Sequence, residues 1–176
     1  MIFTETKLKG AFIIEPEKLK DERGFFARIW CKKEFEAHGL NTRLVQTNVA
    51  FNKKKGVLRG MHYQVTPYEE TKLIRCTEGA IYDVIIDLRE SSPTYKQWIG
   101  VELTQDNYKM LYVPECFAHG YQTLQDNTEV SYQVSQFYAP NSEQGIRWND
   151  PSFTIQWPEA KEKIISVKDQ RWPDYR

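Results

Sequence analysis

The sequence predicts an all-β fold, an antiparallel sandwich or barrel, with one or two short helices. Short runs rich in Val, Ile, Tyr and Phe recur along the chain, and Gly, Pro, Asn and Asp separate them. Only one stretch, Lys32–His38, has the pattern of a helix. Many short strands and few helices are typical of antiparallel sheets that pack around one core.

The expected elements follow in chain order. The strands are Ala11–Ile14, Phe25–Trp30, Val57–Gln64, Leu73–Thr77, Ala80–Leu88, Ile99–Leu103, Met110–Val113, Tyr121–Leu124 and Thr128–Ser135. The helix Lys32–His38 is expected to end at Gly39, and a second short helix is expected near Pro158–Lys163. No repeat, linker or low-complexity segment divides the chain, so residues 1–176 are predicted to form a single domain.

Composition narrows the classes of function. Lys plus Arg and Asp plus Glu both total 24, so the formal net charge is zero, and no nucleic-acid or membrane partner is expected. The three cysteines form no C-x-x-C pair, which indicates neither a zinc site nor a redox pair. No stretch reaches the roughly 18 apolar residues of a membrane-spanning helix, and the N-terminus lacks the apolar segment of a signal peptide. A cytoplasmic protein is the expectation.

The strand Thr128–Ser135 places one polar aromatic residue toward the interior. Its alternation puts Tyr132 on the same face as Val130 and Val134. A phenol on that face either hydrogen-bonds the backbone as a core tyrosine or lines a cavity.

The segment GVLRGMHYQ, Gly56 to Gln64, has the densest chemical signal. Arg59 and His62 lie three residues apart in a strand-like run, and strict alternation would place them on opposite faces. A bulge at Gly60 would bring both side chains to one side. In the alternative, Arg59 points outward and His62 has a structural role.

Two further segments carry polar side chains. VPECFAHGYQTL places His119 just before Gly120 at an expected turn. The C-terminal SVKDQRWPDY carries Lys168 and Asp169 in a polar segment that is expected to be irregular. The remaining histidine, His38, lies in the expected helix and is interpreted as a solvated residue.

Together these segments resemble the dTDP-4-dehydrorhamnose 3,5-epimerase family over nearly the whole chain. The shared motifs, in family order, are DERGFF, VQTN, GVLRGMHYQ, KLIRCTEGAIYDVIIDLRESSPTY, LYVPECFAHGYQTL, EVSYQVSQFYAP, GIRWNDP, IQWP and SVKD. The resemblance implies a cupin-like jelly roll, or double-stranded β-helix, that forms a homodimer. It also implies an isomerase that epimerises a 4-keto-6-deoxy nucleotide sugar without a metal or an organic cofactor.

The resemblance implies roles for individual residues. His62 matches the family's general base, Asp169 the carboxylate that orients it, and Tyr132 the acid on the opposite face of the sugar. Lys72 matches a lysine near the keto oxygen. Arg59 and His119 match family positions that line the pocket. The family positions that hold the nucleotide or diphosphate correspond to Arg23, Gln46, Asn48, Glu143 and Lys168.

These residue types suit proton transfer beside a ketone. Removing such a proton leaves an enolate, so catalysis needs a base, a cation or donor on the oxyanion, and an acid. A histidine, with a pKa of about 6.5, accepts protons near neutrality, and an adjacent carboxylate favours its charged form. Inversion requires the new proton to arrive on the other face, so acid and base are different groups. Lys72 and His119 are candidates to stabilise the enolate. Because the substrate's ketone takes up the electrons, the reaction itself requires no cofactor.

Two features depart from the family pattern. Typical members have a glutamate two residues after RGFF, where this chain has Arg28, and the stretch from Gln46 to Arg59 is one residue longer here. The glutamate accepts from the thymine N3–H, whereas an arginine only donates. Arg28 could contact the carbonyl oxygens of the base, suit cytosine N3, or point away. A dTDP sugar remains the preferred substrate, and a CDP-linked 4-keto sugar is the alternative.

Three other functions stay open. An enzyme that epimerises only C3 or only C5 would carry the same His62, Asp169 and Tyr132. A metal-dependent cupin would need two or three imidazoles with a carboxylate, often in an H-x-H pair, and none of the three histidines here are two apart. A non-catalytic sugar-binding jelly roll would not require the His62–Asp169 pair or Tyr132.

Overall fold

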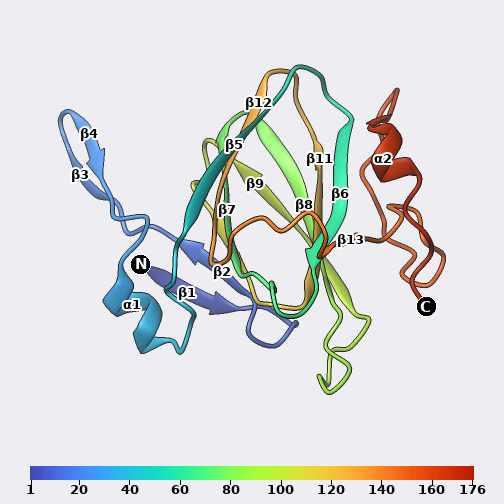
Figure 1. Ribbon diagram of the computed structural model, residues 1–176. Coiled ribbons are helices and arrows are strands. Elements are labelled where there is room, and N and C mark those ends of the chain that lie inside the picture. Colours follow the sequence, from blue (N-terminus) through green and yellow to red (C-terminus); the bar gives the residue numbers. More distant parts are fainter.

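Two sheets face each other in the computed structural model, which describes residues 1–176 (Figure 1). The strand order of the first sheet is β1 (Ile2–Glu5), β2 (Phe12–Glu15), β10 (Met110–Val113), β7 (Lys72–Glu78), β12 (Thr128–Val134) and β5 (Gln46–Asn52). The order of the second is β13 (Glu143–Gly145), β6 (Val57–Gln64), β11 (Phe117–Thr123), β8 (Ala80–Asp87) and β9 (Trp98–Thr104). All these neighbours pair antiparallel, which confirms the predicted all-β, cupin-like jelly roll.

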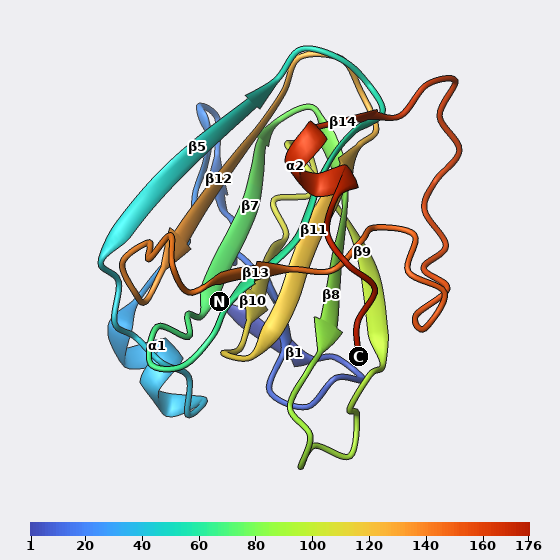
Figure 2. The same cartoon turned by 45° about the vertical axis from the view of Figure 1, so that its right-hand side comes forward.

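Five smaller elements lie outside these paths. The strand β14 (Ile164–Ile165) pairs in parallel with β6, and β3 (Leu19–Asp21) with β4 (Gly24–Phe26) forms a separate hairpin. The helix α1 (Lys32–Ala37) lies near the N-terminus, and the four-residue helix α2 (Val167–Gln170) lies beside β14 at one end of the sandwich (Figure 2). Neither helix is long and apolar enough to cross a bilayer.

The core fills only part of the space between the sheets. Its fully buried side chains come from both layers, among them Ile74 and Leu111 from the first sheet and Ile81 and Ile85 from the second. Burying each such side chain stabilises the fold by about 2 kcal/mol. Tyr121 belongs to this cluster and also lines a cavity, so the apolar core gives way to an open, polar interior there.

Most predicted strands are confirmed within a few residues. Phe25–Trp30 was predicted as one strand, but only Gly24–Phe26 forms β4, because its partner β3 has only three residues and no other strand continues the ladder. The strands β1, β5 and β13 were not predicted, and their pairing depends on distant neighbours.

The helix predicted near Pro158–Lys163 is wrong. This stretch contains no helix, and the chain instead leads into β14, where Ile164 N–H donates to Gly56 O at 2.9 Å. A Cβ on Gly56 would lie 2.1 Å from Glu162 O, so the glycine permits the close approach of this segment. Tertiary pairing with β6 therefore overrides the local helical pattern.

The predicted bulge at Gly60 is confirmed. His119 pairs with His62 and Tyr121 pairs with Arg59, so three steps along β6 match two steps along β11. Gly60 has a φ of +110°, and a Cβ there would lie 2.6 Å from His119 O. The bulge turns Arg59 and His62 toward the same cavity.

The expected turn at His119 and Gly120 is wrong, because both residues lie inside β11. Gly120 serves close packing instead. A Cβ on it would lie 2.7 Å from Arg59 O, so two glycines let β6 and β11 approach each other at the bulge.

Candidate active site

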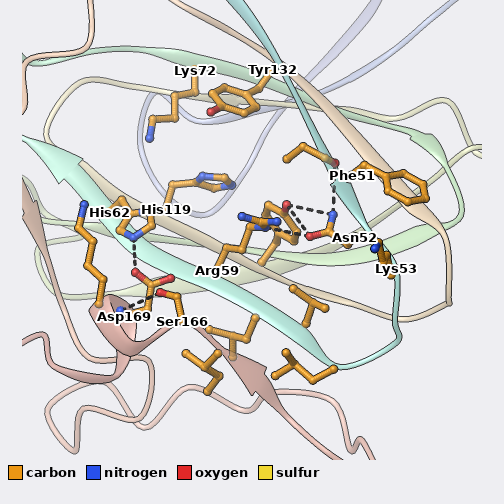
Figure 3. Close-up of a pocket in the computed structure, with 17 residues that line it drawn as sticks. Phe51, Asn52, Lys53, Arg59, His62, Lys72, His119, Tyr132, Ser166 and Asp169 are labelled. Atoms are coloured by element: carbon orange, nitrogen blue, oxygen red, sulfur yellow. Dashed lines mark hydrogen bonds and ion pairs between the residues drawn. The ribbon is translucent and has the colours of Figure 1, made fainter.

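A cavity of about 670 Å³ opens between the two sheets (Figure 3). A neighbouring pocket of about 330 Å³ shares His62, Lys72 and Tyr132 with it, so the two form one cleft. This size matches sites for small organic ligands. The three shared residues come from both sheets and lie at the junction of the two pockets.

His62 on β6 is paired with Asp169 on α2. His62 Nε2 lies 2.6 Å from Asp169 Oδ1, although 107 positions separate them in sequence. Since a carboxylate only accepts, Nε2 carries the proton of this bond and Nδ1 is left available to a ligand. Burial on its own raises the pKa of Asp169, but the hydrogen bond and the charge of His62 outweigh it, so the pKa is lowered.

The sequence forms this pairing through a short capped helix. Ser166 is the N-cap of α2, and its Oγ accepts from Asp169 N–H at 3.0 Å. The other carboxylate oxygen, Asp169 Oδ2, accepts from Gly60 N–H at 3.3 Å. The C-terminal segment is thereby connected to the bulge that orients His62.

A second histidine–aspartate pair lies beside the first. His119 Nε2 on β11 is 2.6 Å from Oδ1 of Asp83 on β8. Asp83 is fully buried, and its Oδ2 has no hydrogen-bond partner. His119 lines the cavity, so its imidazole is placed by a carboxylate within the sheet.

The opposite wall carries Tyr132 and Lys72 (Figure 3). Tyr132 lies on the same face of β12 as the buried Val130 and Val134, as the alternation predicted. Burial, with a smaller contribution from the charge of Glu70, raises the pKa of Tyr132, so the phenol stays protonated at neutral pH. Lys72 is almost buried, and its Nζ lies 3.1 Å from Glu70 Oε1.

Arg59 lines the cavity and is held there by a polar side chain from β5. Its Nε donates to Asn52 Oδ1 at 2.9 Å, and Asn52 Nδ2 donates to Tyr121 OH at 3.2 Å. Burial raises the pKa of Tyr121 to about 12, so this phenol stays neutral. The guanidinium therefore adds a fixed positive charge to the cavity.

The smaller pocket is polar and carries the remaining matched positions. Gln46, Asn48 and Glu143 line it. Glu143 Oε2 accepts from Tyr138 OH at 2.7 Å and lies 2.5 Å from Lys168 Nζ. Lys168 precedes Asp169 on α2, so this ion pair also connects the C-terminal helix to β13.

Arg23 and Arg28 lie away from this cleft. Arg23 sits at the turn of the β3–β4 hairpin, pairs with Asp21 and has a side chain that is 90% exposed. Arg28 follows β4 and pairs with Glu34 at 3.3 Å. The hairpin projects from the sandwich on the side opposite α2 (Figure 1), so these two positions do not join the cavity of their own chain.

Sequence reasoning missed several residues that shape the site. Asp83 is a charged residue inside an apolar strand, and a buried carboxylate requires a partner, so this signal could have identified it. Asn52 and Trp172 carried no comparable signal, because their contacts join segments far apart in the chain. No group of three or more His, Cys, Asp or Glu side chains is arranged to hold a metal ion.

Comparison with known proteins agrees with this architecture. Residues 5–176 match the sequence profile of the family described as dTDP-4-dehydrorhamnose 3,5-epimerase. A dTDP-4-dehydrorhamnose 3,5-epimerase of Shigella flexneri is 43% identical over 166 residues, which cover 94% of this chain and 91% of that protein.

Solved structures are similar along the whole chain. The dTDP-4-dehydrorhamnose 3,5-epimerase of Bacillus anthracis, with TDP and PPi bound, superposes with a TM-score of 0.94 at 42% identity and covers 99% of both chains. The dTDP-6-deoxy-D-glucose-3,5-epimerase of Legionella pneumophila, in complex with dTDP-4-keto-L-rhamnose, gives a TM-score of 0.90 at 35% identity over 99% of this chain and 98% of that one. Both the fold and the near-complete sequence match therefore place this chain in the dTDP-4-dehydrorhamnose 3,5-epimerase family, whose members are isomerases.

Proposed function

We propose that the protein epimerises dTDP-4-dehydro-6-deoxyglucose at C3 and C5 to dTDP-4-dehydrorhamnose, with His62 as the base and Tyr132 as the acid. One observation carries the assignment of roles. A carboxylate-bound imidazole and a protonated phenol lie on opposite walls of one cavity. Epimerisation needs this arrangement, because the proton leaves one face of the sugar and a new proton arrives on the other.

The first step is proton abstraction. C3 and C5 both flank the C4 ketone, so either C–H is acidified by the same carbonyl. His62 Nδ1 takes the proton, and the C–H electron pair moves to the ketone oxygen as an enolate. Asp169 stabilises the imidazolium that forms, because it is a buried carboxylate bonded to the other ring nitrogen.

The enolate oxygen needs positive charge or donors nearby. Lys72 supplies an ammonium on the Tyr132 wall, and His119 supplies an imidazole on the His62 wall. Both are largely removed from water, where an electrostatic interaction is stronger than at the surface. We assign them to the oxyanion rather than to proton transfer at carbon.

The second step is protonation from the opposite wall. The Tyr132 hydroxyl gives its proton to the carbanionic carbon as the enolate returns to a ketone. Its raised pKa keeps that proton in place until it is needed. His62 then releases its proton to solvent and the Tyr132 phenolate takes one from solvent, after which the same two steps at the second carbon complete the double inversion.

The nucleotide part of the substrate requires further groups. Arg59 and Lys168 are cations on the cleft, suited to the diphosphate, and Gln46, Asn48 and Glu143 line its smaller pocket. Arg23 lies at the turn of the projecting hairpin and Arg28 lies just after it, so neither lines the cavity of its own chain.

We infer from this placement that the protein works as a homodimer in which the β3–β4 hairpin reaches the cleft of a second copy. The hairpin exposes Leu19 (69%) and Phe26 (68%), and the edge strand β5 exposes Val49 (62%). Large apolar side chains exposed on a projecting hairpin and on an edge strand are typical of an interface. A partner's hairpin would add Arg23 and Arg28 to the nucleotide side of the cleft.

Mixing two defective variants tests the shared site. Arg23→Glu damages the hairpin and His62→Ala damages the base, so each homodimer is expected to be slow. In a mixed dimer, one cleft combines an intact His62 with an intact partner hairpin, and activity should reappear. No recovery after subunit exchange, or a monomer in analytical ultracentrifugation, would contradict the shared site.

The reaction itself is tested by NMR in D2O with dTDP-4-keto-6-deoxyglucose, following deuterium uptake at C3 and C5. Uptake at both carbons is expected. Uptake at one carbon would restrict the activity to a single epimerisation, and no uptake with either the dTDP or the CDP sugar would overturn the proposal. The two sugars together also test Arg28, because a faster reaction of the CDP sugar would assign cytosine recognition to that arginine.

A further inference from the structure

The indole of Trp172 lies directly on the backbone of Gly145 in β13. A Cβ placed on Gly145 would come within 2.2 Å of the ring atom Cε2. No side chain larger than hydrogen therefore fits beneath the ring in this position. Gly145 is also the residue that pairs with His62 across the β13–β6 ladder. The contact thus sits one strand away from the proposed base.

The same indole is bonded to the proposed orienting carboxylate. Trp172 Nε1–H donates to Asp169 Oδ1 at 3.3 Å, and this oxygen also bonds His62 Nε2. The indole and the His62 imidazole are inclined at 72° to each other, with 6.3 Å between the ring centroids. Lys168 Nζ lies over the indole, 5.5 Å from its centroid. One side chain therefore contacts His62, Lys168 and Asp169.

The segment that carries Asp169 needs such an anchor. A helix of four residues, like α2, has little stability of its own. Beyond the indole the chain is held to the loop after β13, where Arg147 N–H donates to Pro173 O at 3.3 Å and Arg147 pairs with Asp174 at 2.7 Å. Trp172 is the part of this attachment that lies next to the proposed catalytic pair.

We propose that Trp172 is a positioning residue: its indole, seated on Gly145, fixes the Asp169 carboxylate against His62. The inference rests on the proposed function, in which His62 is the base. Trp172 does not contact the reacting carbons in this scheme. It acts through Asp169, because a carboxylate on a short terminal helix must be held within about 1 Å to support the imidazole.

Three variants separate the packing of the indole on Gly145 from the hydrogen bond between Trp172 and Asp169. Trp172→Ala removes both, and we expect kcat to fall about 10-fold with KM little changed. Gly145→Ala keeps the indole, but the new methyl group takes the space in which the ring packs, so we expect a similar fall in kcat. Trp172→Phe keeps an aromatic ring on Gly145 and loses only the N–H, so most of the activity should return. Trp98→Ala is the control, because Trp98 is another half-buried tryptophan, bonded to Phe153 O and absent from the cavity lining.

A double-mutant cycle distinguishes positioning from general destabilisation. If Trp172 acts through Asp169, adding Trp172→Ala to Asp169→Asn should slow the reaction no further. Multiplicative losses, or wild-type kcat in both Trp172→Ala and Gly145→Ala, would overturn the inference. If Trp172→Ala fails to fold, the cycle is run with Gly145→Ala, which alters only one methyl group.

A measurement without substrate separates this inference from the proposed function. The protein has three histidines, so the imidazole NMR signals can be assigned by substitution. The Nε2–H signal of His62 should be retained in Trp172→Phe and lost or shifted in Trp172→Ala and Gly145→Ala, as in Asp169→Asn. An unchanged signal in Trp172→Ala would overturn the positioning role. Failure of deuterium uptake in the wild type would instead overturn the proposed function and leave this spectroscopic result standing.

Discussion

The cavity holds two histidine–aspartate pairs with the same Nε2–Oδ1 distance of 2.6 Å but different surroundings. Asp83 comes from β8, is fully buried, and has one oxygen without a partner. Asp169 comes from the C-terminal helix and receives hydrogen bonds on both oxygens. One carboxylate is part of a sheet, whereas the other is brought in by a terminal segment.

The two imidazoles differ in access. The His62 side chain is 31% exposed and that of His119 is 11% exposed. A base that takes a proton from substrate and returns it to solvent needs access, whereas a group that faces a developing oxyanion needs rigidity. The same pair geometry therefore suits proton transfer at His62 and fixed electrostatic support at His119.

The largest contrast is expected between the two histidines themselves. His62→Ala should lower kcat by about 10³-fold or more, because His119, the other imidazole on that wall, is assigned to the oxyanion and does not replace the base. His119→Ala should lower it by about 10- to 100-fold, since Lys72 remains to support the oxyanion. Deuterium uptake at C3 and C5 measures both. A larger loss in His119→Ala would reverse the two roles.

Replacing the opposing acid should separate exchange from inversion. In Tyr132→Phe, net epimerisation is expected to slow by about 10²-fold or more. His62 can still remove a proton and return a deuteron to the same face, so deuterium should enter with retained configuration. Proton NMR of the recovered sugar distinguishes the two products. Equal loss of exchange and inversion would place Tyr132 in binding or abstraction.

Removing the Asp169 carboxylate should mainly affect activity, whereas removing the Asp83 carboxylate should mainly affect stability. Asp169→Asn should lower kcat by about 100-fold and alter the pH–rate profile, since it leaves the imidazole without its charged partner. Asp83→Asn should mainly lower the free energy of unfolding, by about 2 kcal/mol, because it changes a buried hydrogen bond. Steady-state kinetics and urea unfolding of both variants test the contrast. An unchanged pH profile in Asp169→Asn would remove Asp169 from the mechanism.

The smallest expected effect is on acid stability. Burial raises the pKa of Asp169, but the hydrogen bond and charge of His62 bring it below the ordinary value of 3.8. The folded-state pKa is therefore below the unfolded one, so this bond contributes stability above the unfolded pKa and loses it as the pH falls through the folded pKa. As the pH falls below about 4, the wild type should lose more unfolding free energy than Asp169→Asn. Urea unfolding at each pH measures this free energy. The same pH dependence in the two proteins would contradict the prediction.

Local sequence patterns were informative where one strand or one glycine decided the geometry. The alternation of Val130, Tyr132 and Val134 correctly indicated that the tyrosine faces the interior. Gly60 correctly indicated the bulge that turns Arg59 and His62 to one side. Both signals are carried by neighbours in the chain, so no knowledge of distant pairing is needed to read them.

The same reasoning failed where a distant segment decided the geometry. Gly120 suggested a turn, but in β11 it permits the close approach of β6. The stretch Pro158–Lys163 suggested a helix, but pairing of the following residues with β6 keeps the chain extended.

The sequence by itself determined the strand-rich fold, the inward face of Tyr132, the bulge beside His62 and, through its motifs, the family. Only the tertiary structure decided that Asp83 supports His119, that Trp172 seats on Gly145, and that the hairpin stands clear of its own cleft. The physical reason is the distance along the chain over which each effect acts. Alternation and backbone freedom act over a few residues, whereas these contacts depend on which strands pair and on where the chain ends pack afterwards.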